Sequence, residues 1–312
     1  MKTVRRRLAD GSIKEYRYDK NAPRILPGSF GALTLEYRKS PDFLSLAPRT
    51  QAGYLKYMGE LYRLYDVALI DIRRRHAIRY RDHYRKTPAK ANKVVSMLSV
   101  LLEYAVELEY IPSNPIRRVP LLAVGEYCRW SDDDLAFAYK RFPETMRRAI
   151  ILALYTGQRQ GDVLAMRWSD YDGEGIQVTQ QKTGVKLWIP CPAILRAELE
   201  AWKAAGRSSV TIITNVAGRP YRGYSFGAMF SKEISKHPEL RGLVFHGLRK
   251  TAAAKLAEAG CTVHEIAAIT GHKTLSMLAH YTKEAEQKTR ARAAVIKLEN
   301  VGTKKYKRDA SH

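Results

Sequence analysis

The chain has 312 residues, enough for two compact domains and a short appendage. Its 54 Lys and Arg residues against 31 Asp and Glu residues give a formal net charge of +23, which favours a polyanionic partner, nucleic acid first, over a neutral small molecule. The longest apolar stretch, residues 149–155, is too short to span a bilayer, and no apolar segment follows the basic start as in a secretory signal, so we expect no membrane partner.

The three cysteines, Cys128, Cys191 and Cys261, are widely spaced and odd in number. They form no Cys-x-x-Cys pair, which argues against a disulfide framework and against a zinc site. We therefore expect a protein of the reducing cytoplasm that binds no metal.

Residues 1–40 are predicted to form a short basic N-terminal arm. Asp10-Gly11 separates two basic and aromatic runs, residues 4–8 and 13–18, and this pattern predicts a β-hairpin. Pro and Gly residues at positions 23, 27, 28 and 31 then interrupt regular structure. The alternative for this region is a solvated tail.

Residues 41–120 are predicted to form a helical domain. Tyr54, Met58, Leu61 and Tyr65 recur at helical spacing, and a second apolar stripe runs through residues 94–108. The turn Ile-Pro-Ser-Asn-Pro at 111–115 ends this second helix.

Residues 72–86 carry a run of Lys and Arg interleaved with Tyr80 and Tyr84, a composition suited to gripping phosphates. A solvated helix face is the alternative. The candidate DNA-binding residues are Arg73, Arg74, Arg75, Arg79, Arg81, Arg85 and Lys86.

After a linker at residues 121–128, a second domain is predicted over 129–300, with a basic tail at 301–312. Ser131 and the three acidic residues after it are typical of a helix N-terminus. Helical patterns dominate, but residues 176–180 and 185–189 predict a β-hairpin with Lys182 near its tip, and residues 211–214 a further short strand. The predicted fold class is mainly α with a small β-sheet.

Four separated motifs in this second domain suit phosphoryl transfer. They are Thr156-Gly-Gln-Arg159-Gln-Gly-Asp162, Lys182 on the hairpin, His246-Gly-Leu-Arg249, and Gly271-His272 followed nine residues later by Tyr281. A phosphodiester under attack gathers negative charge on its non-bridging oxygens, and fixed cations stabilise that state. Arg159 and Arg249 suit this role because a guanidinium group can clamp two oxygens at once.

The order and spacing of these motifs resemble those of the tyrosine recombinases, also called phage-type integrases, over roughly residues 40–298. The resemblance implies a core-binding domain at 41–120 and a catalytic domain at 129–300. It also implies that Tyr281 is the nucleophile, which forms a 3′-phosphotyrosine and frees a 5′-hydroxyl, and that Lys182 protonates the leaving oxygen. We assign His246 as the base, His272 as a hydrogen-bond donor to the phosphate, and Asp162 as a supporting residue.

The same resemblance implies a site-specific DNA recombinase that integrates or excises a phage or other mobile element in the bacterial cytoplasm. Its partners would be double-stranded DNA with specific sites, three further copies of the chain in a tetramer, and an accessory bending or directionality factor. No cofactor is expected, because the covalent adduct conserves the bond energy. The helix predicted at residues 285–298 would dock on a neighbouring subunit or on its own domain.

Two other functions remain open at this point. A type IB topoisomerase-like enzyme uses similar chemistry but relaxes DNA without a partner site. A non-catalytic DNA-binding protein would keep the basic surface alone.

Overall fold

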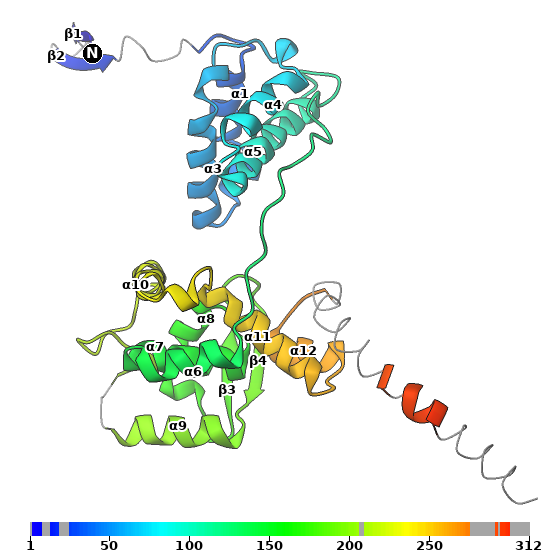
Figure 1. Cartoon of the computed structure of the whole chain (residues 1–312). Helices are drawn as coiled ribbons and strands as arrows, with labels where there is room; N and C mark the ends of the chain where they lie inside the picture. Colours follow the sequence, from blue (N-terminus) through cyan, green and yellow to red (C-terminus); the bar gives the residue numbers. More distant parts are fainter. Residues whose placement is uncertain are drawn as a thin grey trace, which may run out of the picture. The chain divides into compact units, whose positions relative to one another are not determined.

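The computed structural model of the chain describes residues 2–7, 13–18, 25–205, 209–274, 291–292 and 294–299. The chain divides into two compact units, Met1–Gly125 and Glu126–His312 (Figure 1). Each unit encloses its own hydrophobic core. Within the described residues, every helix is too short or too polar to cross a membrane.

The chain begins with a two-stranded antiparallel hairpin. Strand β1 (Lys2–Arg7) pairs with β2 (Ile13–Tyr18), with Lys2 opposite Tyr18 and Arg7 opposite Ile13. The predicted hairpin is thereby confirmed. The Asp10-Gly11 turn lies outside the described residues.

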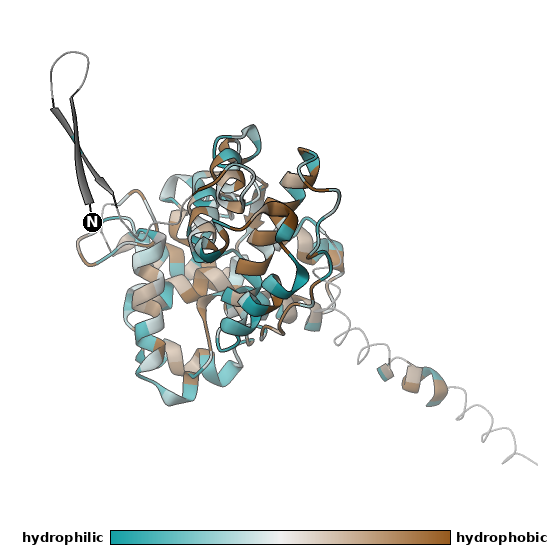
Figure 2. Ribbon diagram, turned by 90° about the horizontal axis from the view of Figure 1, so that it is seen from above, coloured by the Kyte–Doolittle hydropathy of each residue, from teal (hydrophilic) through white to brown (hydrophobic). Residues whose placement is uncertain are grey.

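The helices of the first unit are α1 (Phe30–Tyr37), α2 (Pro41–Leu44), α3 (Pro48–Glu60), α4 (Arg74–His83) and α5 (Pro88–Glu107), with 3₁₀ turns at Tyr62–Leu64 and Leu69–Asp71. The long helix α5 presents Leu98, Leu101 and Leu102 to the core, where each is fully buried. The helical prediction for this region is confirmed. Figure 2 shows hydrophobic and hydrophilic residues sharing the same helices, as expected for helices with one buried face.

The predicted extent of the N-terminal arm, residues 1–40, is wrong at its C-terminal end. Helix α1 lies inside that range, begins at an N-cap formed by Ser29, and buries Phe30 and Leu33 in the core of the first unit. Gly31 does not interrupt the helix but allows close packing, because a Cβ there would lie 2.6 Å from the carbonyl oxygen of Tyr65. Burial of this apolar face outweighs the low helix propensity of one glycine.

The helices of the second unit are α6 (Asp132–Arg141), α7 (Glu144–Thr156), α8 (Gln160–Ala165), α9 (Ala193–Ala204), α10 (Gly223–Ser235), α11 (Phe245–Glu258) and α12 (Val263–Thr270), with 3₁₀ turns at Trp168–Asp170 and Pro238–Leu240. Helix α7 packs against α11 through buried side chains that include Leu152, Ala153 and Leu248. The predicted fold class, mainly α with a small sheet, is confirmed.

The sheet of the second unit is the hairpin of β3 (Gly175–Thr179) and β4 (Lys186–Pro190), which pair antiparallel with Thr179 opposite Lys186. Trp188 of β4 packs over Gly175, where a Cβ would lie 2.5 Å from the indole ring. This hairpin confirms the prediction and places Lys182 in its connecting turn.

The further strand predicted at residues 211–214 does not form. Thr211 bridges to Arg167 and Thr214 to Pro220, each as an isolated β-bridge. The two ends of this segment pair with different parts of the chain, so no continuous ladder can develop.

Candidate active site

Five of the six predicted catalytic residues lie in the described part of the second unit, on separate elements. Arg159 precedes α8, Lys182 lies in the β3–β4 turn, His246 and Arg249 lie in the first turns of α11, and His272 follows α12. Tyr281 lies outside the described residues.

Arg249 is buried, with 3% of its surface exposed, and holds two helix ends together. Its Nη1 donates to the carbonyl oxygens of Gly157 (2.8 Å) and Thr270 (2.7 Å), at the C-termini of α7 and α12. The negative ends of two helix dipoles therefore stabilise the guanidinium charge in a buried position.

Two glycines make this approach possible. Gly157 and Gly271 end α7 and α12 in the left-handed conformation, with φ of 63° and 70°. A Cβ on Gly157 would lie 2.9 Å from Cγ2 of Thr270, and one on Gly271 would lie 2.5 Å from Nε2 of Gln180. The glycines of the Thr-Gly and Gly-His motifs thus serve close packing as well as backbone conformation.

Arg159 contacts the same region through a buried amide. Its Nη1 donates to Oε1 of Gln180 at 3.0 Å, and Nε2 of Gln180 donates to the carbonyl oxygen of Thr270 at 2.8 Å. The structure therefore joins Arg159 and Arg249 through one carbonyl oxygen at the end of α12.

His272 also belongs to this network, and its ring geometry fixes its protonation. Nη2 of Arg249 lies 3.1 Å from Nε2 of His272, and an arginine can only donate, so Nε2 carries no proton. The proton is then on Nδ1, which donates to Oγ1 of Thr270 (2.7 Å), and that hydroxyl donates to Ile266 O at 2.6 Å. Burial first, and Arg249 next, lower the pKa of His272 to about 4.

This tautomer differs from the predicted role of His272. With Nε2 accepting from Arg249, the neutral ring positions the arginine instead of donating to a phosphate. Donation to a phosphate would require a protonated ring or a new tautomer, and it stays a prediction.

His246 keeps only part of its surface exposed to solvent, and its ring lies edge-on to Tyr127, with centroids 5.3 Å apart. Desolvation lowers its pKa from the ordinary 6.5, and the charges of Arg249 and Arg159 lower it further. The ring is therefore unprotonated at neutral pH, the form that a general base requires.

Lys182 is exposed, and Asp162 fixes the turn that carries it. The buried carboxylate of Asp162 accepts from the backbone N–H of Gln181 at 2.9 Å through Oδ1. The predicted supporting residue thus connects α8 to the hairpin, one residue from Lys182.

Sequence reasoning missed two buried glutamines, Gln158 and Gln180. Nε2 of Gln158 donates to the carbonyl oxygens of Thr156 (2.9 Å) and Ile269 (2.8 Å), and its Oε1 accepts from Gln180 at 2.7 Å. A signal for Gln180 exists, because the period of two in β3 that buries Ile176 and Val178 continues to residue 180. A polar residue at a position that the alternation of β3 predicts to be buried, two residues before Lys182, is the sequence signal that points to Gln180.

The basic run of the first unit divides into two groups. Arg74 donates to the carbonyl oxygens of Arg117 (3.2 Å) and Arg118 (3.1 Å), and Arg81 donates to that of Pro120 (3.2 Å). Arg73 likewise donates to Ile72 O at 3.3 Å. These three residues stabilise the unit itself.

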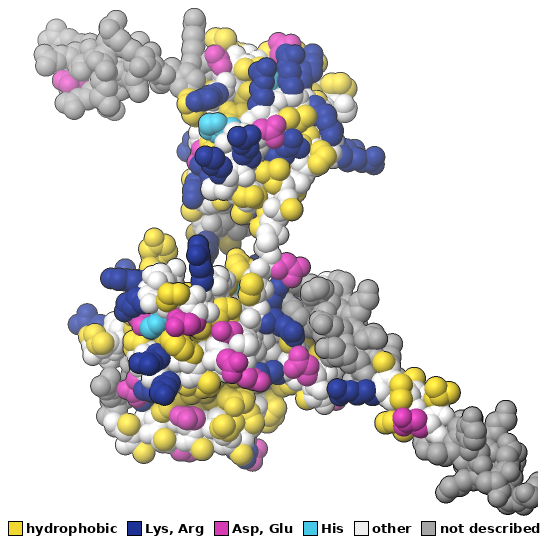
Figure 3. Space-filling view, viewed as in Figure 1, with side chains coloured by type: hydrophobic (Ala, Val, Ile, Leu, Met, Phe, Trp, Pro, Cys, Tyr) yellow, Lys and Arg dark blue, Asp and Glu magenta, His cyan; other side chains and the backbone are white. Residues whose placement is uncertain are grey.

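The other four candidates, Arg75, Arg79, Arg85 and Lys86, are exposed. Arg79 lines a cavity of about 660 Å³ together with Arg63, His76 and His83. Lys and Arg side chains recur across the visible face of the first unit, interspersed with hydrophobic side chains (Figure 3). Direct DNA contact by these residues stays a prediction.

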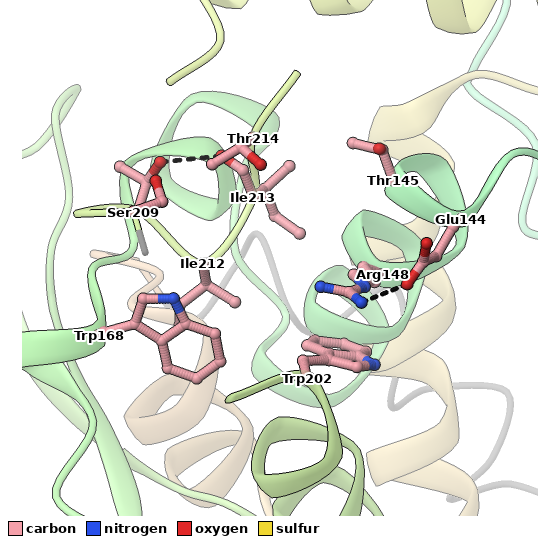
Figure 4. Close-up of a pocket in the computed structure, with 10 residues that line it drawn as sticks. Glu144, Thr145, Arg148, Trp168, Trp202, Ser209, Ile212, Ile213 and Thr214 are labelled. Carbon is pink, nitrogen blue, oxygen red and sulfur yellow. Dashed lines mark hydrogen bonds and ion pairs between the residues drawn. The ribbon is translucent and has the colours of Figure 1, made fainter. Parts of the chain in front are cut away.

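A small cavity of about 30 Å³ lies elsewhere in the second unit, between Trp168, Trp202 and Arg148 (Figure 4). Arg148 lies over the Trp202 ring at 5.1 Å and pairs with Glu144. Nε of Arg148 and Oγ of Ser209 are buried without a hydrogen-bond partner among the described residues, so the cavity suits an ordered water. It is lined by neither Arg159 nor Arg249. Within the described residues, no cluster of His, Cys, Asp and Glu is placed to hold a metal ion.

Comparison with known proteins adds independent findings. Residues 134–288 match the Phage integrase family. The chain is 28% identical to the integrase of Escherichia phage HK022 over 266 residues, which cover 76% of this chain and 70% of that protein. It is 28% identical to the shufflon-specific DNA recombinase of Escherichia coli over 241 residues, which cover 73% of this chain and 60% of that protein.

Solved structures of the phage lambda integrase share the fold. A lambda integrase dimer bound to a COC′ core site superposes with a TM-score of 0.70 at 24% identity, covering 81% of this chain and 77% of that one. A lambda integrase tetramer bound to a Holliday junction superposes with a TM-score of 0.69 at 25% identity, covering 79% and 78%.

Proposed function

This chain belongs to the phage integrase family and is a tyrosine-type site-specific recombinase, and from that premise we propose that it cuts and rejoins DNA through a 3′-phosphotyrosine intermediate. The observation that carries the proposal is the joining of Arg159 and Arg249 by one buried network at the end of α12. Two fixed guanidinium groups are the arrangement that a five-coordinate phosphorane requires.

In this mechanism Tyr281 attacks the phosphorus and displaces the 5′-oxygen. His246, unprotonated at neutral pH, takes the phenolic proton, while Arg159 and Arg249 bind the non-bridging oxygens. Lys182 gives a proton to the departing 5′-oxygen. Reversal of the same steps by a different 5′-hydroxyl rejoins the strands, so the reaction conserves bond energy and consumes no ATP.

The proposed partners are double-stranded DNA with specific sites and further copies of the chain. The related lambda integrase structures are of a dimer on a core site and a tetramer on a Holliday junction, which supports a tetramer here during strand exchange. We propose integration or excision of a phage or other mobile element in the bacterial cytoplasm, with an accessory factor that sets its direction. The prophage integrase of Mycobacterium tuberculosis among its relatives supports the mobile-element role.

The test is formation of a covalent adduct. Nicked duplexes with a randomised core are incubated with the protein, denatured, and the DNA that stays attached to protein is sequenced. We expect one selected core sequence, linked through its 3′-phosphate to Tyr281, and no adduct with Tyr281→Phe. An adduct of undiminished yield with Tyr281→Phe contradicts the assignment of the nucleophile, and relaxation of plasmids that lack the selected core favours a topoisomerase instead.

A further inference from the structure

Gln180 is fully buried where the β3–β4 hairpin meets the ends of α7 and α12. Its Oε1 accepts from Nη1 of Arg159 (3.0 Å) and from Oγ1 of Thr183 (2.7 Å). Its Nε2 donates to Oε1 of Gln158 (2.7 Å) and to the carbonyl oxygen of Thr270 (2.8 Å). One side chain therefore contacts a predicted catalytic arginine, the turn that carries Lys182, and the carbonyl that holds Arg249.

The orientation of this amide is fixed by its partners. Arg159 can only donate and the carbonyl of Thr270 can only accept, so the oxygen faces Arg159 and the nitrogen faces α12. The amide oxygen of Gln180 accepts two hydrogen bonds and its nitrogen donates two, so both ends of the amide are satisfied within the protein. A buried network satisfied in this way holds its members in one geometry.

The shared oxygen has a mechanical consequence. Thr183 is the residue after Lys182, and its hydroxyl and the Arg159 guanidinium group bind the same atom. A shift of the turn therefore moves the acceptor that orients Arg159, and a shift of Arg159 moves the acceptor that holds the turn. The clamp on the phosphate and the proton donor to the leaving oxygen are linked through Oε1 of Gln180.

We propose that Gln180 is a positioning residue for strand cleavage, which sets Arg159 and the Lys182 turn in register through one oxygen. This inference rests on the proposed recombinase function. Gln180 touches no reacting atom, so it is not itself a catalytic residue and would act only by positioning other groups.

The experiment compares two versions of the selected nicked duplex, one with the ordinary phosphodiester and one with sulfur in place of the bridging 5′-oxygen. A thiolate leaves without protonation, because a thiol has a pKa near 8.5, far below that of an alcohol. The sulfur duplex therefore bypasses the proton donor but still needs the arginine clamp. The rate of adduct formation is measured on both.

Gln180→Met keeps the length of the side chain and removes its hydrogen bonds. We expect adduct formation on the ordinary duplex to slow about 100-fold, the effect of a misplaced catalytic group. On the sulfur duplex the rate should fall only about tenfold, because proton donation no longer matters there and only the misplacement of Arg159 slows the reaction. If Gln180 merely filled the core, its substitution would slow adduct formation on the ordinary and the sulfur duplex by the same factor.

Two further variants separate the halves of the proposal. Thr183→Val removes the turn's donor to Oε1 and should slow the ordinary duplex about tenfold and the sulfur duplex less, because Arg159 keeps its own bond to Oε1. Gln181→Ala is the matched control, because Gln181 is the adjacent glutamine of the same hairpin and its exposed side chain bonds only to Gly161 O among the contacts described. It should react like the unaltered chain on both duplexes.

Equal deficits of Gln180→Met on both duplexes, together with unaltered rates for Thr183→Val, would overturn the link to the turn. Rates of Gln180→Met close to those of the unaltered chain would overturn the positioning role altogether. Failure of the unaltered chain to form an adduct on either duplex is a different result, since it removes the recombinase function on which the inference rests.

Discussion

Arg249 shows how a charged side chain is stabilised when it is almost completely buried. The carbonyl oxygens of Gly157 and Thr270 and the unprotonated Nε2 of His272 all accept from its guanidinium group. These acceptors are neutral, so they orient the arginine while leaving its net charge in place for a phosphate. His272 can serve in this way only while its ring is unprotonated.

The low pKa of His272 predicts how stability depends on pH. Well above pH 6.5 the ring is neutral in both the folded and the unfolded chain, so there it contributes nothing to the pH dependence. As the pH falls from 6.5 towards about 4, the unfolded chain binds the proton and the folded chain does not, so the free energy of unfolding decreases. The second unit should therefore unfold at a lower urea concentration at pH 5 than at pH 7.

Tryptophan emission during urea titration measures this effect in the second unit alone, because all four tryptophans lie there. They are Trp130, Trp168, Trp188 and Trp202. His272→Gln removes the titrating ring and should lose less stability over the same pH interval. Equal losses in both proteins would assign the acid sensitivity to other groups, His246 first.

At the scale of elements, the site depends on how two helices end. Gly271→Ala places a Cβ in the left-handed region and 2.5 Å from Nε2 of Gln180. Gly218→Ala is the matched control, since its φ of 72° is similar and no atom lies within 4 Å of its added Cβ. We expect the control to cost about 1 kcal/mol and Gly271→Ala about 1–3 kcal/mol more, measured by urea unfolding. Equal costs would mean that the α12 end adjusts to the added methyl group.

Local patterns predicted most elements correctly. Alternation and the Lys182-Thr-Gly turn predicted the β3–β4 hairpin, and apolar spacing predicted the helices of the first unit. Helix α1 was missed because Gly31 is a residue that usually interrupts helices. In the structure Gly31 instead allows close contact with Tyr65, which lies far along the chain and is not visible in the local pattern.

Candidate site residues could be proposed from the sequence because charged residues in motifs are recognised by their type and spacing, as with Arg159, His246 and Arg249. Their catalytic roles stay predictions. The glutamine network joins residues 158, 180 and 270, and such pairing depends on tertiary packing that spacing does not encode. The tautomer of His272 likewise depends on a distant partner, Arg249, together with its near neighbour Thr270.

At the scale of the whole molecule, the formal net charge of +23 predicts binding to DNA that weakens steeply with salt. Arg79→Ala should lower the slope of log affinity against log salt by about one, because the exposed arginine of α4 would release one phosphate contact. Arg74→Ala is the informative comparison, since its guanidinium group holds the carbonyls of Arg117 and Arg118. It should destabilise the first unit instead. An unchanged slope for Arg79→Ala would place the DNA contacts on another surface.

The packing of Trp188 over Gly175 has a practical consequence for kinetics. This indole is 47% exposed and donates to Asp172 at 2.8 Å, whereas Trp130 and Trp202 are buried and Trp168 is half-buried. Acrylamide in the solvent should quench Trp188 more than the other three tryptophans, because its indole is the most exposed of the four. The hairpin thus carries a built-in optical probe, and stopped-flow fluorescence could time its movement during a single turnover without any attached dye.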